Sequence, residues 1–133
     1  IPMAAGSGDA DFNRAWERIA AHLRAHKPEF IILQCGADSI AGDPLTGMEY
    51  SPASFTKAAA ELAKIAQQYA GGRLLALGGG GYNLSNIAAG WNNVVEAIVV
   101  ALSSFLFSLS GCGELCLIVC RYAHAPAHLP GPD

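Results

Sequence analysis

The sequence of 133 residues predicts an α/β fold with parallel strands. Two short apolar runs, at residues 30–33 and 73–77, have the length of buried strands. Amphipathic helical patterns stand before, between and after these runs. This order of helix, strand, loop, helix, strand, loop and helix is typical of a parallel sheet whose crossovers are helices.

The first helix is expected to begin near Phe12, with Asp9 or Asp11 as its N-cap. Apolar side chains recur at helical spacing after this start, with charged side chains between them. Pro28 ends the pattern, because a proline disfavours the helical conformation of the residue before it. The run at 30–33 follows at once and is expected to be a buried parallel strand.

The second helix is expected over about residues 54–70, where aromatic and aliphatic side chains form one apolar stripe. A Gly-Gly pair then ends it, as glycine after a helix usually does. The run at 73–77 is the second expected strand. After a glycine-rich loop, a third helix is expected from near Ser85 at least to Val100.

Composition excludes several classes of protein. Only 14% of residues are charged and 52% are hydrophobic, which excludes a highly charged disordered chain. A net charge of −3 provides no basic surface for nucleic acid, and four cysteines are too few for a disulfide-dense secreted scaffold. Charge is uneven, since residues 1–73 hold 15 of the 19 charged residues.

Each predicted strand ends in a glycine-rich loop that carries one reactive polar side chain, Asp38 in residues 36–44 and Tyr82 in residues 78–83. Ligands of open parallel sheets bind at the carboxyl ends of the strands. Asp38 taken alone is more typical of a turn cap than of a metal ligand or a base. The four glycines before Tyr82 permit close backbone approach, as in a phosphate-binding loop, but the lysine and the acidic partner of the nucleotide-binding motifs are missing.

Two segments carry a family resemblance. Residues 36–45 contain Gly-Ala-Asp and Gly-Asp-Pro-Leu, and residues 77–84 are Leu-Gly-Gly-Gly-Gly-Tyr-Asn-Leu. In this order and spacing they resemble the zinc-dependent histone deacetylases and the bacterial acetoin-utilization deacetylases of the same superfamily. The opening, Pro2 to Phe12, is similar as well, so the resemblance covers roughly residues 1–100. It implies a three-layer α/β/α sandwich like that of arginase.

The resemblance also implies roles for individual residues. Asp38 matches the second Asp of an Asp/His/Asp zinc site, and Tyr82 matches the tyrosine that hydrogen-bonds the substrate carbonyl. Zinc would polarise that carbonyl, and the phenol would donate to the developing oxyanion. Four further residues are implied to contact substrate, in the wall of the acyl-lysine channel or beside the acetyl group: Pro44, Leu45, Gly80 and Gly81.

The other site residues of the family are absent. The chain contains neither the Asp-x-His pair that supplies two zinc ligands nor two adjacent histidines for acid–base work. We therefore interpret residues 1–102 as the C-terminal portion of a deacetylase-like catalytic domain, a truncated sandwich with an incomplete zinc site. Alone, the chain is expected to bind no zinc tightly and to hydrolyse nothing. The alternative is a non-catalytic α/β interaction module, derived from a deacetylase, without bound metal.

The implied substrate is the acetylated lysine of a protein or a small acetylated amine, and no nucleic-acid partner is expected. No basic region precedes an apolar core at the start, so no secretory signal is visible. With cysteines expected to be reduced, this favours the cytoplasm or nucleus.

Other metal-binding side chains have ordinary explanations. His22 and His26 are expected on a solvated helix face, and Cys35 in the core. A second series recurs every four residues, but a proline interrupts it and four-residue steps drift around a helix, so no metal site is expected there: Cys112, Cys116, Cys120, His124 and His128.

Residues 103–133 form an apolar and then proline-rich tail of unclear origin, which the family resemblance does not include. The stretch 97–120 has the length of a membrane span and one charge, Glu114. Serines and glycines dilute it, so a mis-assigned or read-through C-terminus is favoured over a membrane anchor.

Overall fold

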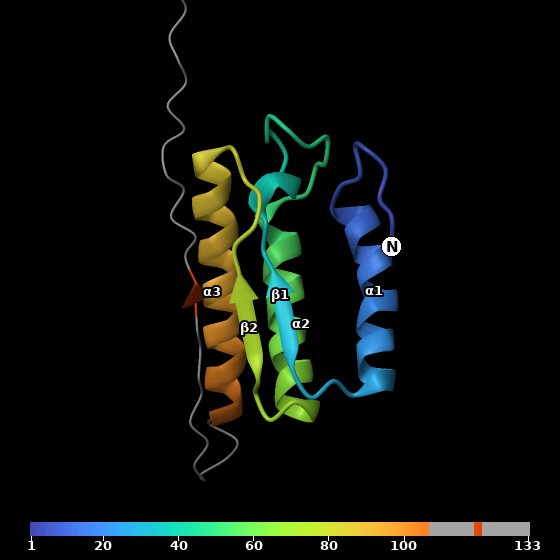
Figure 1. The fold of residues 1–133 in the computed structure, drawn as a ribbon, viewed down its shortest axis with the longest axis vertical. Coiled ribbons are helices and arrows are strands. Elements are labelled where there is room, and N and C mark those ends of the chain that lie inside the picture. The colour runs from blue at the N-terminus through green and yellow to red at the C-terminus, as the bar shows by residue number, and fades with distance from the viewer. Residues whose placement is uncertain (107–118, 121–133) are drawn as a thin grey trace, which may run out of the picture.

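The computed structural model describes residues 1–106 and 119–120. Helix α1 (Asp9–His26) leads to strand β1 (Ile31–Gln34) and a short 3-10 helix η1 (Ala37–Ser39). Helix α2 (Pro52–Tyr69), strand β2 (Leu74–Leu77) and helix α3 (Leu84–Leu106) follow, and β3 (Val119–Cys120) is the last element (Figure 1). The predicted helix–strand order is confirmed.

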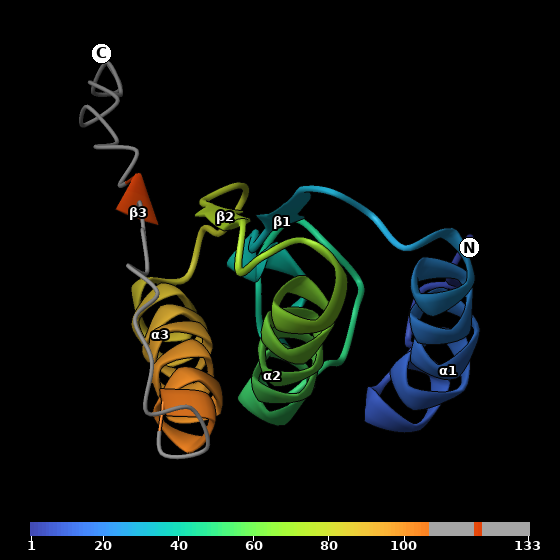
Figure 2. The ribbon, with the colours of Figure 1, turned by 90° about the horizontal axis from the view of Figure 1, so that it is seen from below.

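The strands are parallel and lie in the order β1-β2-β3. Ile31 lies opposite Leu74 and Gln34 opposite Leu77, so β1 and β2 end level with one another. The helices α1, α2 and α3 lie side by side along one face of the sheet (Figure 2). The structure is therefore two layers of an α/β/α sandwich, a partial α/β fold.

Helix α1 begins three residues earlier than the sequence predicts, and neither predicted aspartate is its N-cap. Gly8 is the N-cap, in an extended conformation, and the Asp11 carboxylate accepts a hydrogen bond from the Gly8 N–H (3.2 Å). Asp9 is the first helical residue. Its carboxylate is used elsewhere, as an acceptor for two serines at the start of α2, so it does not cap its own helix.

Helix α2 has the boundaries that capping chemistry favours. The Ser51 hydroxyl accepts a hydrogen bond from the Ala53 N–H (3.2 Å), and Pro52 occupies the first turn, where its missing N–H costs nothing. Gly71 and Gly72 have φ angles of 57° and 80°, a left-handed conformation that ends the helix at the predicted place.

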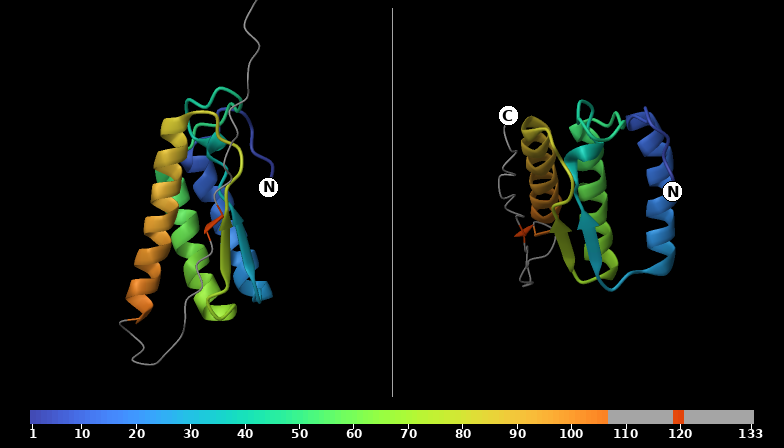
Figure 3. Two further views of the ribbon diagram at one scale, coloured as in Figure 1. Left: turned by 60° about the vertical axis from the view of Figure 1, so that its left-hand side comes forward. Right: turned by 45° about the horizontal axis from the view of Figure 1, so that its top comes forward.

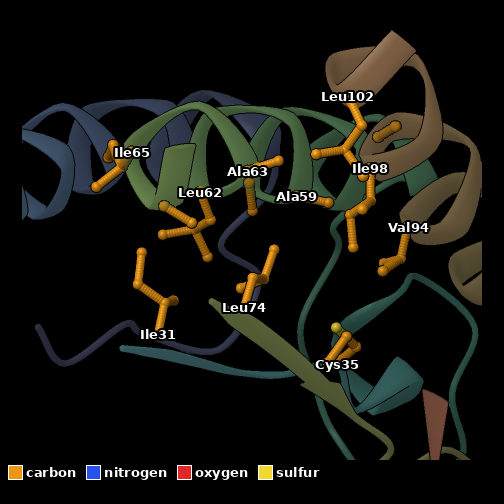
Figure 4. Packing of buried hydrophobic residues seen from close by; sticks show 14 of the residues in the cluster. Ile31, Cys35, Ala59, Leu62, Ala63, Ile65, Leu74, Val94, Ile98 and Leu102 are labelled. Atoms are coloured by element: carbon orange, nitrogen blue, oxygen red, sulfur yellow. The ribbon is translucent and has the colours of Figure 1, made fainter. Parts of the chain in front are cut away.

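The core lies between α2, α3 and the inner face of the strands (Figure 4). Ile65 of α2 and Val94 of α3 are each 1% exposed, and Ile31 and Leu74 extend from the strands into the same cluster. Cys35, 3% exposed, completes it at the end of β1, which confirms its predicted place in the core. This packing fixes the ends of both strands relative to α3.

The outer face of the sheet is not covered by any of the described residues. The strand predicted at 30–33 is present as β1, but the prediction that it is buried is wrong. Ile32 of β1 is 63% exposed, and Phe30 just before it is 52% exposed. Parallel sheets are ordinarily covered on both faces. The apolar run is therefore that of a covered strand, but the layer that would cover it is not among the described residues.

Helix α3 continues to Leu106, four residues past the predicted boundary at 102. Most of the tail at 103–133 lies outside the described residues, including Cys112, Cys116, His124 and His128. The division of the chain at residue 102 therefore stays a prediction. Within the described part of the chain, no helix is long and apolar enough to cross a membrane.

Candidate functional site

The loops that follow β1 and β2 meet at the carboxyl edge of the sheet (Figure 3). The Cys35 N–H donates to the Leu77 carbonyl oxygen (2.7 Å), and the Ala37 N–H donates to the Gly80 carbonyl oxygen (2.6 Å). These bonds continue the parallel pairing beyond the strands. The loop with Asp38 and the loop with Tyr82 are thereby held against one another, as the sequence predicts for this edge.

The glycine run is required by this close approach. A Cβ built on Gly80 would lie 2.7 Å from Asp38 Cγ, and one on Gly79 would lie 2.6 Å from Gln34 Nε2. Gly81 has a φ of 148°, which side chains rarely adopt, and a Cβ there would lie 3.0 Å from Ile87 Cγ1. A side chain in this run would push the two loops apart.

Asp38 is held on η1 with its carboxylate against Gly80. The hydroxyl of Thr46 donates to the Asp38 carbonyl oxygen, which fixes the main chain of η1. The half-buried carboxylate itself accepts no hydrogen bond from the residues that the structure describes.

Tyr82 is 50% exposed and is held by its main chain. Its N–H donates to Asp43 Oδ2 (2.9 Å). The next residue, Asn83, caps α3, since its side-chain oxygen accepts from the N–H groups of Ser85 (3.0 Å) and Asn86 (3.3 Å). The phenol therefore extends from a segment that is anchored on both sides.

Asp43 is a residue that sequence reasoning missed. It is 8% exposed, and its Oδ1 accepts from the Leu45 N–H (2.9 Å) and the Thr46 N–H (3.4 Å), while Oδ2 accepts from Tyr82. Burial raises the pKa of the Asp43 carboxyl, but these main-chain hydrogen bonds outweigh burial and hold the pKa below its ordinary value. The signal was an aspartate in a Gly-Asp-Pro turn, which indicates a local cap but not a bond to Tyr82.

The remaining implied substrate contacts lie on these two loops. Pro44 and Leu45 are exposed, Leu45 at 67%, and Gly80 and Gly81 are half-buried. All four border the edge where Asp38 is located. The structure thus brings every predicted site residue to one end of the sheet.

The described residues do not by themselves form a zinc site. Among them, no three His, Cys, Asp or Glu side chains are grouped so as to hold a metal ion. A catalytic zinc needs three protein ligands. Asp38 has the oxygen donors that zinc accepts, but it supplies one ligand, and no reaction step through a metal follows from this chain alone.

Two other candidates lie apart from these loops. The ring centroids of His22 and His26 lie 4.0 Å apart, with the rings tilted by 33°, on an exposed face near the C-terminal end of α1. That end of α1 lies opposite to the loops (Figure 1). The Cys35 thiol faces the core, where burial raises its pKa to about 12. At that pKa it is not a nucleophile near neutral pH.

Comparison with known proteins agrees with this geometry. The family profile described as Histone deacetylase domain matches residues 1–98. Histone deacetylase 10, chloroplastic, of rice is 33% identical over 90 residues, which are 67% of this chain and 20% of that protein. The Bacillus subtilis acetoin utilization protein AcuC is 35% identical over 85 residues, or 63% of this chain and 22% of that protein.

Two solved structures that resemble this chain are also deacetylase domains. The HDA15 HD domain superposes with a TM-score of 0.66 at 29% identity, over 74% of this chain and 27% of that one. The histone deacetylase Clr3 superposes with a TM-score of 0.65 at 26% identity, over 73% of this chain and 16% of that one. The chain thus spans about a fifth of the length of the curated relatives it matches.

Proposed function

The chain belongs to the histone deacetylase domain family, and from this premise we propose that it is the C-terminal segment of a zinc-dependent deacetylase domain that hydrolyses acetyl-lysine or a related acetyl-amide. The observation that carries the proposal is the close contact between the loop after β1 and the loop after β2. It sets the Asp38 carboxylate against Gly80, two residues before Tyr82, at the edge of the sheet where parallel folds bind ligands.

Tyr82 is the oxyanion donor in this proposal. Hydrolysis of an amide passes through a tetrahedral intermediate whose oxygen gains negative charge. The exposed phenol would donate a hydrogen bond to that oxygen, and because the main chain of Tyr82 is held by Asp43, little reorganisation would be needed as the charge develops. Removal of one such donor typically costs a factor of about 10²–10³ in kcat.

Asp38 is proposed as one oxygen ligand of zinc, which when bound would supply Lewis-acid polarisation of the amide carbonyl. The other ligands and the histidine pair would have to come from residues outside this chain. Supporting this assignment is a carboxylate without a hydrogen-bond donor among the described residues, located beside the loop of Tyr82. The isolated chain is proposed to hold no zinc tightly and to be inactive.

The acyl-lysine substrate would lie along the exposed Pro44 and Leu45, with the acetyl group beside the Gly80 and Gly81 backbone. The flat, side-chain-free surface of these glycines suits a small acyl group. The compartment is proposed to be the cytoplasm or nucleus, although the similar rice and Arabidopsis proteins Histone deacetylase 10 and 14 are named chloroplastic.

The test is a chimera in which residues 1–98 replace the matching segment of Bacillus AcuC, assayed on an acetyl-lysine peptide. We expect activity in the chimera. Tyr82→Phe should lower turnover about 10²-fold with zinc content unchanged, whereas Asp38→Ala should lose zinc. Full turnover in Tyr82→Phe, or normal zinc content in Asp38→Ala, would show that the corresponding role is wrong.

A second function is favoured by one observation, the exposed Phe30 and Ile32 on the outer face of the sheet. In a non-catalytic interaction module without metal, this face would bind another protein. The sequence encoded upstream of Ile1 separates the two proposals. An Asp-x-His and an adjacent histidine pair there support the enzyme, and their absence supports the module.

A further inference from the structure

One carboxylate joins the two loops of the proposed site. Asp43 is almost fully buried, and its two oxygens accept three main-chain N–H groups, two from its own loop and one from Tyr82. No lysine or arginine forms an ion pair with it in the part of the chain that the structure describes. The negative charge of Asp43 is therefore stabilised by main-chain N–H groups of both loops, and not by a neighbouring cation.

We propose that Asp43 is a positioning residue: it fixes the main chain of Tyr82 against the loop of Asp38 and so sets where the phenol stands over the substrate. The proposal rests on the role proposed above for Tyr82. Asp43 touches neither substrate nor metal in it. The residue acts through the main-chain N–H groups of the Tyr82 loop, first of all that of Tyr82 itself.

The other hydrogen bonds between the two loops do not hold the main chain of Tyr82 itself. Asn83 Nδ2 donates to the Gly42 carbonyl oxygen (3.3 Å), and Asn86 Nδ2 donates to the Ala41 carbonyl oxygen (3.1 Å). Both bonds follow Tyr82 in sequence and hold the start of α3. The Ala37–Gly80 bond precedes it. Tyr82 lies between these two points in the sequence, and its own N–H is held by the hydrogen bond to Asp43.

A carboxylate is the group that this place requires. Both of its oxygens face N–H donors, so each must be an acceptor. Asparagine has the same shape but one NH2 group. Its oxygen keeps two bonds when it faces the Leu45 and Thr46 N–H groups, so the NH2 group faces the Tyr82 N–H without a bond. Asp43→Asn therefore removes the bond to one loop while it disturbs the packing little.

The first test needs no variant. In the full chain labelled with ¹⁵N and ¹³C, NMR should show a scalar coupling between the Tyr82 amide nitrogen and Asp43 Cγ across the hydrogen bond. The Tyr82 amide should also exchange with solvent at least about tenfold more slowly than in an unstructured peptide. Exchange at the unstructured rate without a coupling would overturn the proposal.

The second test uses Asp43→Asn with Asp9→Asn as the matched control. Asp9 is also a carboxylate that joins two elements through hydrogen bonds, but its partners are Ser51 and Ser54, away from Tyr82. We expect the Tyr82 amide to lose its protection in Asp43→Asn and to keep it in Asp9→Asn. Equal protection of Tyr82 in both variants would contradict the proposal.

The third test separates positioning from general stability. In the AcuC chimera, Asp43→Asn should lower kcat about tenfold or more with KM and zinc content little changed, since small displacements of a catalytic group are costly. In the Tyr82→Phe background it should cost much less, because the group it positions is gone. If Asp43→Asn lowered kcat by the same factor with Tyr82 present and in the Tyr82→Phe chimera, the role of Asp43 would be structural and not that of positioning Tyr82. A Tyr82→Phe chimera of full activity would instead refute the role of Tyr82 and leave the bond measured by NMR intact.

Discussion

The carboxylate of Asp38 lies directly against the α-carbon of Gly80, so that a methyl group on Gly80 would stand 2.7 Å from Asp38 Cγ. One residue can change only if the other moves. The distance therefore ties the conformation of the Tyr82 loop to the position of the proposed zinc ligand.

Gly80→Ala should test this relationship. The new methyl group has to displace Asp38 or part the loops, and overpacking of this kind typically costs about 1–3 kcal/mol. The measurement is urea unfolding of the full chain. Gly47→Ala is the control, since its Cβ would lie 3.4 Å from Ala5 Cβ in ordinary contact, and it should change stability by less than about 0.5 kcal/mol. Equal stability of both variants would mean that the loops are not in close contact.

Asp9 should contribute to stability by joining α1 to α2. Its carboxylate accepts from the Ser51 N–H (2.8 Å) and from the hydroxyls of Ser51 and Ser54 (both 2.6 Å). Ser54 is 4% exposed, so Asp9→Ala leaves a buried hydroxyl without its acceptor. We expect a loss of about 2–3 kcal/mol in the free energy of unfolding. Asp11→Ala, which removes a partly exposed carboxylate on the same helix, should cost less.

The same residue predicts how stability depends on acid. Burial raises the pKa of Asp9, but the hydrogen bonds from Ser51 and Ser54 outweigh it, so the pKa lies below the ordinary 3.8. A carboxyl whose pKa is lower in the folded chain stabilises it above the unfolded pKa. That stabilisation is lost as the pH falls below 3.8 and through the folded pKa. Unfolding curves between pH 6 and about 2.5 should show a smaller acid loss in Asp9→Ala than in the unmodified chain.

These residues show how far the sequence predicts the structure. The C-terminal end of α2 follows from the Gly-Gly pair, because capping is a local preference that the sequence displays directly. The helix begins at Pro52, two residues before the predicted start, because Ser51 caps it. The roles of Asp9 and Asp43 do not follow, because the bonds of each join segments about forty residues apart in sequence. Local capping preferences predicted a helix cap at Asp9 or Asp11, but Asp9 instead accepts hydrogen bonds from Ser51 and Ser54.

The exposure of Ile32 could not be predicted from the sequence for a different reason. An apolar run has the same composition whether or not the layer that covers it is present, so the sequence indicated a buried strand. Asp38 and Tyr82 were found because both follow a strand at its carboxyl end, a position that the parallel topology determines. Their roles in metal and substrate binding rest on family resemblance and stay predictions.

Cys35 should be unreactive in the folded chain. Burial raises its pKa to about 12, so almost no thiolate is present at pH 8. We expect iodoacetamide at pH 8 to leave the peptide with Cys35 unmodified in native conditions and to alkylate it fully in urea, as read by mass spectrometry. Rapid native alkylation of this peptide would show that the core opens at the end of β1.

The outer face of the sheet should govern self-association of the isolated chain. Ile32 is 63% exposed on β1, whereas its neighbour Ile31 is 6% exposed and faces the core. Ile32→Thr keeps a β-branched side chain and removes apolar surface from water, so we expect unchanged or slightly higher stability and less association in sedimentation velocity. Ile31→Thr is the matched control, because the same change in the core should cost about 2–3 kcal/mol by placing a hydroxyl there. Equal losses of stability in the two variants would show that the outer face of β1 is covered in solution, by a second copy or by another part of the chain.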